Sequence, residues 1–224
     1  MEGLAIFVPF IAGEHGTSGP LNQYFAFWIK QTKKDISAMP KTIIVDIDNT
    51  LWDLAPELWK HLQISNPQMP PPERWTDWDF WAEHVRVEDL YRALREIHMQ
   101  QDLYIPYPQS RYFLAALKER GYYIIIASHR EKGTLDPTVR WLNRYEMAFD
   151  EVHLSRDKSV LFDRSWAIVD DSPVTLEKAA TAGIVRAGLR NPWNEWTNHP
   201  LFDNLSEVLA YIDSKRQEEE TLNA

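Results

Sequence analysis

Five short apolar runs alternate with longer segments of helical periodicity along most of this chain. The runs cover residues 42–45, 122–128, 151–154, 166–169 and 184–187. Uninterrupted apolar runs bounded by turn residues are typical of strands that are buried on both faces of a parallel sheet. Because crossovers between parallel strands are right-handed and carry helices, the pattern predicts an α/β fold: a three-layer, doubly wound, Rossmann-like parallel sheet.

Proline, glycine and polar residues mark the ends of the helices expected between these runs. Ser172 followed by Pro173 combines a helix cap with proline at the first helical position, and Gly183 ends that helix. The last helix is expected over residues 204–215. The polar residues 216–224 that follow it are expected to form a frayed tail.

A long helical insertion is expected between the first two strands. Leucines recur at three- and four-residue spacing over residues 51–62, and a second amphipathic segment covers residues 87–97. A simple connection between a strand and a helix needs far fewer residues. The sequence therefore divides into a core domain, residues 41–51 and 106–215, and a mostly helical cap, residues 52–105.

Residues 1–40 form an N-terminal extension to this pattern. Residues 13–20 carry three glycines and a proline, which is typical of a flexible linker. Residues 21–30 are rich in aromatic side chains and could form a short helix that docks onto the domain or makes the protein a homodimer. Met39 directly precedes the first strand, so the fold could also begin there.

Composition and charge exclude several classes of protein. The formal net charge of −9 argues against binding a nucleic-acid polymer, which needs a basic face, but it leaves room for a mononucleotide. The chain has no cysteine, which excludes disulfides and thiolate metal sites. The apolar residues 4–12 are too short to cross a bilayer and lack the basic flank of a signal peptide. We therefore expect a cytoplasmic protein without a membrane partner.

Polar side chains follow three of the expected strands. Asp46 and Asp48 follow the first strand, Ser128 ends the second, and the pair Asp170-Asp171 follows the fourth. Ligands of doubly wound sheets bind at the carboxyl ends of the strands, where these side chains meet. Crowded carboxylates repel each other unless a cation lies between them, and Mg²⁺ prefers oxygen ligands. The alternative is that an aspartate, Asp171 for example, only caps the following helix.

Four motifs appear in the order in which one large family carries them. All four lie at or just past the end of an expected strand. They are Asp-x-Asp-x-Thr at residues 46–50, Ser128, Lys158 and the pair Asp170-Asp171. With these motifs in this order, residues 41–190 resemble the haloacid dehalogenase (HAD) superfamily of phosphotransferases. The resemblance implies a cap, at the position of the insertion, that covers the active site.

A closer likeness appears in two segments. Residues 152–159, Val-His-Leu-Ser-Arg-Asp-Lys-Ser, and residues 191–194, Asn-Pro-Trp-Asn, look like the 5′(3′)-deoxyribonucleotidase group of that superfamily. The chain departs from the group at its first motif, where Asn49 and Thr50 stand in place of the usual Gly-Val. Asp-x-Asp-x-Thr is common across the superfamily, so the departure concerns the substrate and leaves the chemistry unchanged.

The resemblance implies a role for each motif residue. Asp46 would be the nucleophile that forms an aspartyl-phosphate, and Asp48 the general acid that protonates the leaving oxygen and then the base that activates water. The Mg²⁺ ligands would be Asp46, the backbone carbonyl of Asp48, and Asp170, with Asp171 bonded through water. The phosphate would be bound by Ser128, Lys158 and His129, although His129 could equally lie exposed on a loop.

Four aromatic residues crowd into the insertion after a proline-rich stretch: Trp75, Trp78, Phe80 and Trp81. They could stack the base of a nucleotide, or they could form the hydrophobic core of a small cap. Together with the motifs they predict a Mg²⁺-dependent phosphomonoesterase that hydrolyses a small organic phosphate, preferably a (deoxy)nucleoside 5′-monophosphate. The alternatives are a phosphatase of another small metabolite or of a phosphoprotein, and a non-catalytic scaffold that retains the fold.

Overall fold

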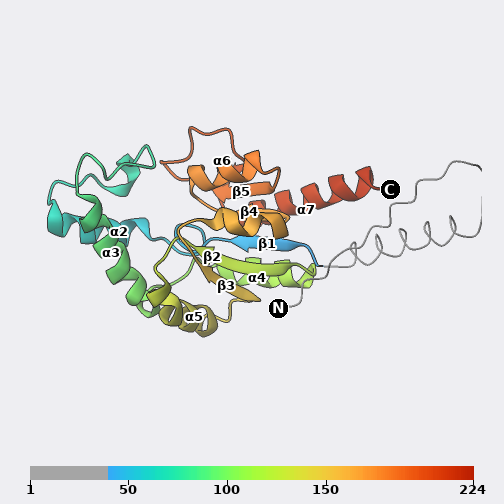
Figure 1. Cartoon of the computed structure of the whole chain (residues 1–224), viewed down its shortest axis with the longest axis horizontal. Coiled ribbons are helices and arrows are strands. Elements are labelled where there is room, and N and C mark those ends of the chain that lie inside the picture. The colour runs from blue at the N-terminus through green and yellow to red at the C-terminus, as the bar shows by residue number, and fades with distance from the viewer. Residues whose placement is uncertain (1–39) are drawn as a thin grey trace, which may run out of the picture. The chain divides into compact units, whose positions relative to one another are not determined.

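The computed structural model of the protein describes residues 40–224 (Figure 1). The expectations for residues 1–39, including the linker, the aromatic segment and a start of the fold at Met39, lie outside this range. No helix in the described part of the chain has both the length and the apolar character that a membrane crossing requires.

Six parallel strands form the sheet, in the order β3-β2-β1-β4-β5-β6. The predicted α/β fold with a doubly wound parallel sheet is confirmed. The strands are β1 (Thr42–Val45), β2 (Tyr123–Ser128), β3 (Glu151–Leu154), β4 (Ala167–Val169), β5 (Val185–Leu189) and β6 (Leu201–Phe202). The sequence pattern does not predict β6, because a strand of two residues has no apolar run that marks it.

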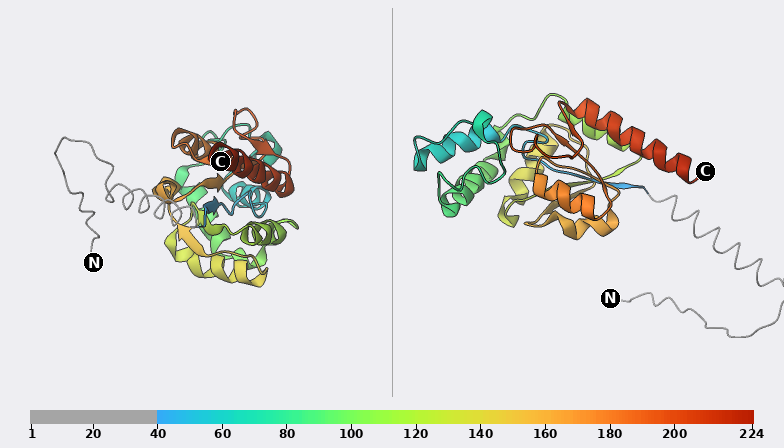
Figure 2. Two further views of the ribbon diagram at one scale, coloured as in Figure 1. Left: turned by 90° about the vertical axis from the view of Figure 1, so that its right-hand side faces the viewer. Right: turned by 90° about the horizontal axis from the view of Figure 1, so that it is seen from above.

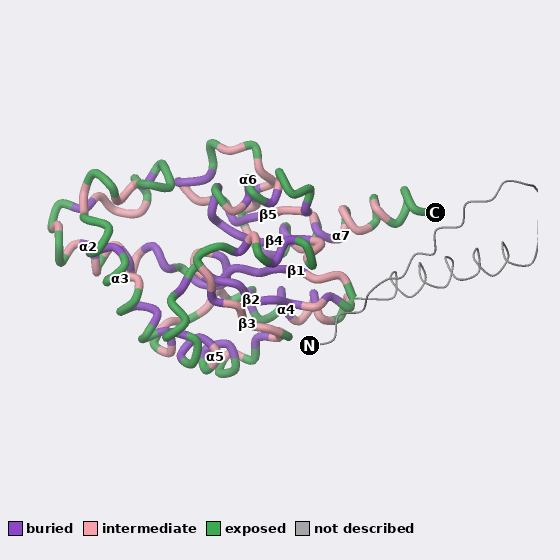
Figure 3. The backbone as a smooth tube through the Cα atoms, viewed as in Figure 1, coloured by how far each residue is buried: buried purple, intermediate pink, exposed green. Residues whose placement is uncertain are grey.

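Successive residues of the strands face opposite layers of helices. Ile43 and Val45 pack into the larger cluster of buried residues, whereas Ile44 between them packs into a smaller cluster. The larger cluster contains residues of α4 (Ser110–Glu119), α5 (Leu135–Arg144) and α7 (Leu205–Leu222). The smaller one contains residues of α6 (Pro173–Thr181) and of η4, a 3-10 segment at Lys158–Arg164. Figure 2 shows these layers on either side of the sheet, and Figure 3 shows the strands between them largely buried.

The predicted helical insertion after β1 is present. Its two main helices are α2 (Ala55–Ser65) and α3 (Val87–Met99), and a short 3-10 segment, η1 (Pro72–Arg74), lies between them (Figure 1). The two connections to the core are fastened to each other. Trp52 stacks on Tyr104 with 4.6 Å between ring centroids, and Ser110 Oγ donates to the Leu51 carbonyl at 2.8 Å.

The last helix differs from the prediction. α7 continues to Leu222, beyond the predicted end at residue 215, and the fraying of residues 216–224 stays a prediction. Glu219, near its end, accepts hydrogen bonds from Lys41 Nζ at 2.6 Å and from Trp166 Nε1 at 2.6 Å. These contacts anchor the polar end of the helix to the residues before β1 and β4. Because these partners are distant in sequence, the local pattern of the last helix does not predict where the helix ends.

Candidate active site

The carboxyl ends of β1 and β4 bring Asp46 and Asp170 together at one edge of the sheet. Asp46 directly follows β1, and its backbone N–H donates to the Val169 carbonyl at 2.9 Å. Lys158, at the start of η4, places Nζ 2.5 Å from Asp46 Oδ1 and 2.6 Å from Asp170 Oδ2. Asp46, Asp170 and Lys158 are all buried. The ammonium group therefore bridges two carboxylates that are shielded from bulk water.

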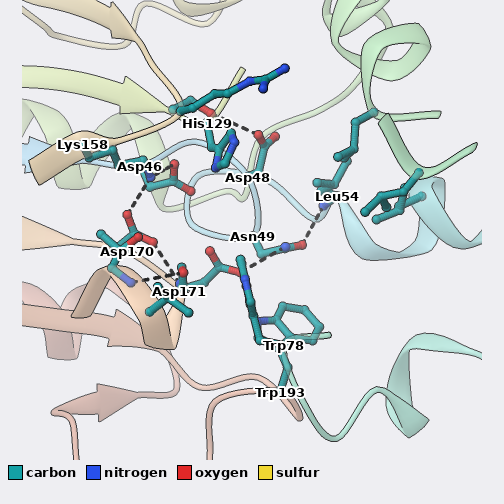
Figure 4. Close-up of a pocket in the computed structure, with 18 of the residues that line it drawn as sticks. Asp46, Asp48, Asn49, Leu54, Trp78, His129, Lys158, Asp170, Asp171 and Trp193 are labelled. Atoms are coloured by element: carbon teal, nitrogen blue, oxygen red, sulfur yellow. Dashed lines mark hydrogen bonds and ion pairs between the residues drawn. The ribbon is translucent and has the colours of Figure 1, made fainter. Parts of the chain in front are cut away.

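Asp171 completes a cluster of three buried carboxylates (Figure 4). One oxygen each from Asp46, Asp170 and Asp171 lies within 4.8 Å of the others. β5 supports this cluster from behind, because a Cβ at Gly188 would lie 2.3 Å from the Asp170 carbonyl oxygen. Only glycine lets β5 approach the acidic pair this closely.

Burial and crowding act strongly on the charges of the cluster. Burial, with Asp170 and Asp48 nearby, raises the pKa of Asp46 to about 7, although Lys158 acts in the opposite direction. Burial also raises the pKa of Asp171 well above its usual range, and Asp46 and Asp170 add to the effect. Burial opposes the charge on Lys158, but its two carboxylate partners outweigh burial and raise the pKa of the lysine.

The donor set of the cluster fits Mg²⁺. Three carboxylates and one ammonium group leave a formal charge of −2 in a buried space, which a divalent cation neutralises. The donors are all oxygens, which Mg²⁺ prefers. Asp46, Asp170 and Asp171 would hold the ion, which would offset the charge of a bound phosphate. The carboxylate of Asp48 is not among these donors.

Mg²⁺ is expected to bind more weakly as the pH is lowered through about 7. The folded-state pKa of Asp46 is raised to about 7, so protons compete with the ion for this carboxylate below that pH. Asp171, whose pKa is also raised, acts in the same direction. Calorimetric titration with Mg²⁺ on either side of that pH measures the effect. In Asp46→Asn the pH dependence becomes weaker, and an affinity of the wild type that does not change with pH contradicts the prediction.

Asp48 is surrounded by four side chains from three separate segments. Arg130 donates from Nε and Nη2 to the two carboxylate oxygens, and its guanidinium group is fully buried. Trp52 Nε1 donates to Oδ1 at 2.9 Å, and Ser128 Oγ donates to Oδ2 at 3.2 Å. His98, at the end of α3 in the cap, places Nε2 3.2 Å from Oδ2. One helix of the cap thus contacts the second aspartate of the first motif.

The surroundings of Asp48 hold it in the ionised form. Burial alone would raise its pKa, but Arg130 and His98 outweigh burial and lower the pKa well below the usual range. Burial and the nearby charge of Arg130 lower the pKa of His98. At neutral pH Asp48 is therefore an anion that can accept a proton.

No sequence motif indicates that Trp52, His98 and Arg130 belong to the site. Arg130 follows Ser128, where a contact with substrate is the natural expectation. Its Nη1 instead donates to Thr138 Oγ1 at 3.0 Å, away from the cavity. The donors to Asp48 come from 4 to 82 residues away along the chain, so spacing carries no signal of them.

Ser128 and His129 both line the cavity next to the carboxylates, but they lie differently. Ser128 is buried, and its hydroxyl is bonded to Asp48. His129 is exposed, at the edge of the cavity (Figure 4). The expectation that both contact a phosphate stays a prediction.

A cavity of about 350 Å³ opens above the carboxylates, between the core and the insertion. The core side is polar, whereas the insertion contributes mainly apolar and aromatic side chains. This is large enough for a small phosphorylated molecule with its phosphate against Lys158. The polar core side and the apolar insertion side of the cavity together favour a ligand with one charged end and one apolar end.

The four aromatic rings predicted to meet a ligand have different surroundings. Trp75 is buried, stacks on Phe80 with 3.8 Å between ring centroids, and donates from Nε1 to the Pro70 carbonyl at 2.8 Å. Trp75 is therefore part of the interior of the cap, and the half-buried Phe80 packs on it; both rings also line the cavity. Trp78 is 37% exposed and lines the cavity (Figure 4). Trp81 is half-buried and also lines the cavity.

Comparison with known proteins finds similar folds among solved structures. No protein-family model matches the chain, and no curated protein matches it by sequence. Solved structures do match. A predicted phosphoglycolate phosphatase from Haemophilus somnus 129pt has a TM-score of 0.55 at 16% identity, over 77% of this chain and 98% of that one. A haloacid dehalogenase-like hydrolase from Streptococcus pneumoniae gives the same values.

A HAD-superfamily hydrolase of subfamily IA from Geobacter sulfurreducens PCA has a TM-score of 0.52 at 20% identity, over 77% of this chain and 99% of that one. The fold is that of the HAD-superfamily hydrolases. The match covers nearly the full length of each of these neighbours. The likeness of two segments to deoxyribonucleotidases stays a prediction.

Proposed function

We propose that the protein is a Mg²⁺-dependent phosphomonoesterase that works through an aspartyl-phosphate on Asp46. The observation that supports this most strongly is the buried group of Asp46, Lys158 and the Asp170-Asp171 pair on the floor of the cavity. Phosphoryl transfer needs positioning and compensation of charge more than any other contribution from a protein. This group supplies a carboxylate nucleophile, a fixed cation and the donors for a metal ion.

Asp46 is arranged to attack a phosphorus atom. Its Oδ1 accepts from Lys158, and Oδ2 accepts no hydrogen bond from any side chain of residues 40–224. In the first step a bond forms between an Asp46 oxygen and phosphorus while the bond from phosphorus to the leaving oxygen breaks. Lys158 offsets the negative charge of the phosphoryl group throughout. The leaving oxygen takes a proton from Asp48, which is ionised in the empty site and receives that proton from the monoanion of the bound phosphomonoester.

Asp48 returns the enzyme to its starting state. In the second step a water molecule attacks the phosphorus and its proton passes to Asp48, which Arg130 and His98 keep as an anion beforehand. Inorganic phosphate leaves, and Asp46 is free again. The proton that Asp48 accepts in this step leaves with the phosphate product, and Asp48 is ionised again. Mg²⁺, when bound, supplies additional charge compensation at the phosphoryl oxygens.

The function is tested by phosphate release from a panel of phosphomonoesters, with Mg²⁺ and with a chelator. p-Nitrophenyl phosphate tests for catalysis of any kind, and the panel includes deoxyribonucleotides, ribonucleotides, small phosphorylated acids and a phosphopeptide. Mg²⁺-dependent release from at least one compound is expected. Mg²⁺ binding without release from any compound would favour the non-catalytic scaffold.

A nucleoside 5′-monophosphate is the substrate class that we propose first. The support is the nucleotidase-like pair of segments, together with Trp78, an exposed ring that lines the cavity. A small phosphorylated acid is the second candidate, because Arg156 lines the cavity and has no acidic partner within residues 40–224. Its guanidinium group lies 5.7 Å from the ring centroid of Tyr91 in the cap and could meet a second anionic group.

Trp78→Ala is expected to raise the KM for a nucleotide about ten- to a hundredfold, since stacking on a base contributes roughly 1–3 kcal/mol. Hydrolysis of acetyl phosphate is expected to change little, because so small a substrate does not reach the ring. Trp75→Ala is the matched control: this ring is buried, so its loss lowers the melting temperature and impairs both substrates alike. If Trp78→Ala affects both substrates equally, the cap does not stack a base.

A further inference from the structure

Asn49 is the fourth residue of the first motif, and its backbone has a conformation that few residues adopt. Its φ is +54°, in the left-handed region that asparagine tolerates better than most other non-glycine residues. Its side-chain amide uses both ends. Oδ1 accepts from the backbone N–H groups of Leu54 and Ala55, each at 3.1 Å, and Nδ2 donates to Asp171 Oδ2 at 3.1 Å (Figure 4).

The first of these contacts fastens the start of α2. This helix has no side-chain cap from its own N-cap residue, Leu54. The first N–H groups of a helix have no partner within the helix, and an outside acceptor stabilises that end. Asn49 supplies the acceptor from the motif loop, so the first turn of the cap helix is bonded to the residue next to Asp48.

The second contact fixes one oxygen of Asp171. Oδ2 accepts from Asn49 and also from Trp193 Nε1 at 3.1 Å. The Trp193 ring in turn lies 6.4 Å from that of Trp75 in the cap, centroid to centroid. Oδ1 of Asp171 accepts no hydrogen bond from any side chain in the described range, which leaves it available to a cation.

We propose that Asn49 is a positioning residue that turns Asp171 Oδ1 towards the metal ion and couples metal binding to the order of the first turn of α2. The proposal rests on the Mg²⁺ site of the proposed function. The amide group of Asn49 is bonded both to Asp171 and to the start of α2. A bound ion that fixes Asp171 therefore also fixes Asn49 and the start of the helix. By reciprocity, whatever loosens the helix start weakens binding of the ion.

Asn49→Gly removes both contacts and keeps the positive φ free of strain. The Mg²⁺ dissociation constant, measured by calorimetry without substrate, is expected to rise about ten- to a hundredfold, the usual effect of losing a partner that orients a metal ligand. Trp193→Phe removes the other donor to Asp171 and keeps the aromatic packing, and a smaller rise is expected. In the wild type Mg²⁺ is expected to slow amide hydrogen exchange at the start of α2, and in Asn49→Gly this protection is lost.

Asn204→Gly is the matched control. Asn204 is the N-cap residue of α7 and also accepts two backbone N–H groups at a helix start, those of Ser206 and Glu207, each at 3.1 Å, but it is not among the residues that line the cavity. It is expected to speed exchange at the start of α7 and leave Mg²⁺ affinity unchanged. If Asn49→Gly binds Mg²⁺ like the wild type, or if Mg²⁺ leaves exchange at α2 unchanged in the wild type, the inference is wrong.

These readouts separate the inference from the proposed function. Mg²⁺ affinity and amide exchange are measured on the full chain without substrate. A wild-type protein that shows the coupling but hydrolyses no phosphomonoester contradicts the proposed function and leaves the inference standing. An active phosphatase in which Asn49→Gly changes neither readout contradicts the inference alone.

Discussion

Asp46→Asn is expected to lower turnover about a thousandfold or more for every phosphomonoester that the protein hydrolyses. The amide keeps the size of the side chain and one oxygen, but it lacks the charge that attacks phosphorus. Lys158 keeps its contact with Asp170 at 2.6 Å, so the rest of the cluster stays in place. The variant therefore tests the nucleophile with little change to its surroundings.

Asp46→Asn is expected to fold and to be as stable as the wild type, so that a loss of turnover can be assigned to the missing nucleophile. The folded-state pKa of Asp46 is about 7, above the usual 3.8 of an aspartate, so its ionised form destabilises the metal-free protein at higher pH. Asparagine removes that charge, and at about pH 8 without Mg²⁺ the melting temperature is not expected to fall. Asp163→Asn, at an exposed position in η4, is the control and leaves both quantities unchanged. More than about a tenth of wild-type turnover in Asp46→Asn would contradict its assignment as nucleophile.

Much of the fold follows from local patterns that survive in the sequence. β1, β2 and β4 are almost wholly buried, and strands of this kind carry few polar residues before their carboxyl ends. The polar residues at those ends therefore mark one edge of the sheet, and the parallel arrangement brings Asp46, Ser128 and Asp170 to that edge. Ser172 caps α6 as its sequence indicates, accepting from the Thr175 N–H at 3.3 Å.

The parts that could not be predicted depend on contacts between distant segments. The end of α7 is held by Lys41 and Trp166, which nothing in the last residues of the chain reveals. Arg130 and His98 meet at Asp48 only because α3 of the cap returns to the end of β2. Nothing in the sequence around Arg130 or His98 indicates that either residue contacts Asp48.

In the aromatic cluster, too, the sequence predicts that the rings are important but not which role each of them has. Four rings in seven residues indicate either a ligand surface or a small core, and composition cannot separate the two. The structure assigns Trp75 to the core of the cap, because it is buried and its N–H has a backbone partner, and leaves Trp78 partly exposed to the cavity. The distinction depends on a hydrogen bond and a stacking contact that are formed only in the folded cap.

Asp48→Asn is expected to abolish steady-state hydrolysis nearly as completely as Asp46→Asn, while allowing the first chemical step with an activated substrate. p-Nitrophenolate leaves without a proton, so Asp46 can still form the aspartyl-phosphate. The attack of water then lacks its base, and the phospho-enzyme accumulates. A burst of up to one equivalent of p-nitrophenol per protein is expected, followed by very slow release. Intact-protein mass spectrometry detects the covalent phosphate directly.

Asp48→Asn is also expected to destabilise the fold, and the experiment must separate this loss of stability from the loss of the base. Both carboxylate oxygens accept from Arg130, and an amide offers only one acceptor to a buried guanidinium group. We expect a loss of about 2–4 kcal/mol in the free energy of unfolding. Thr138→Val is the matched control, because it removes the other partner of Arg130 and keeps Asp48. It is expected to lower stability without accumulating phospho-enzyme. A burst in Thr138→Val, or wild-type turnover after the burst in Asp48→Asn, would show that Asp48 is not the base.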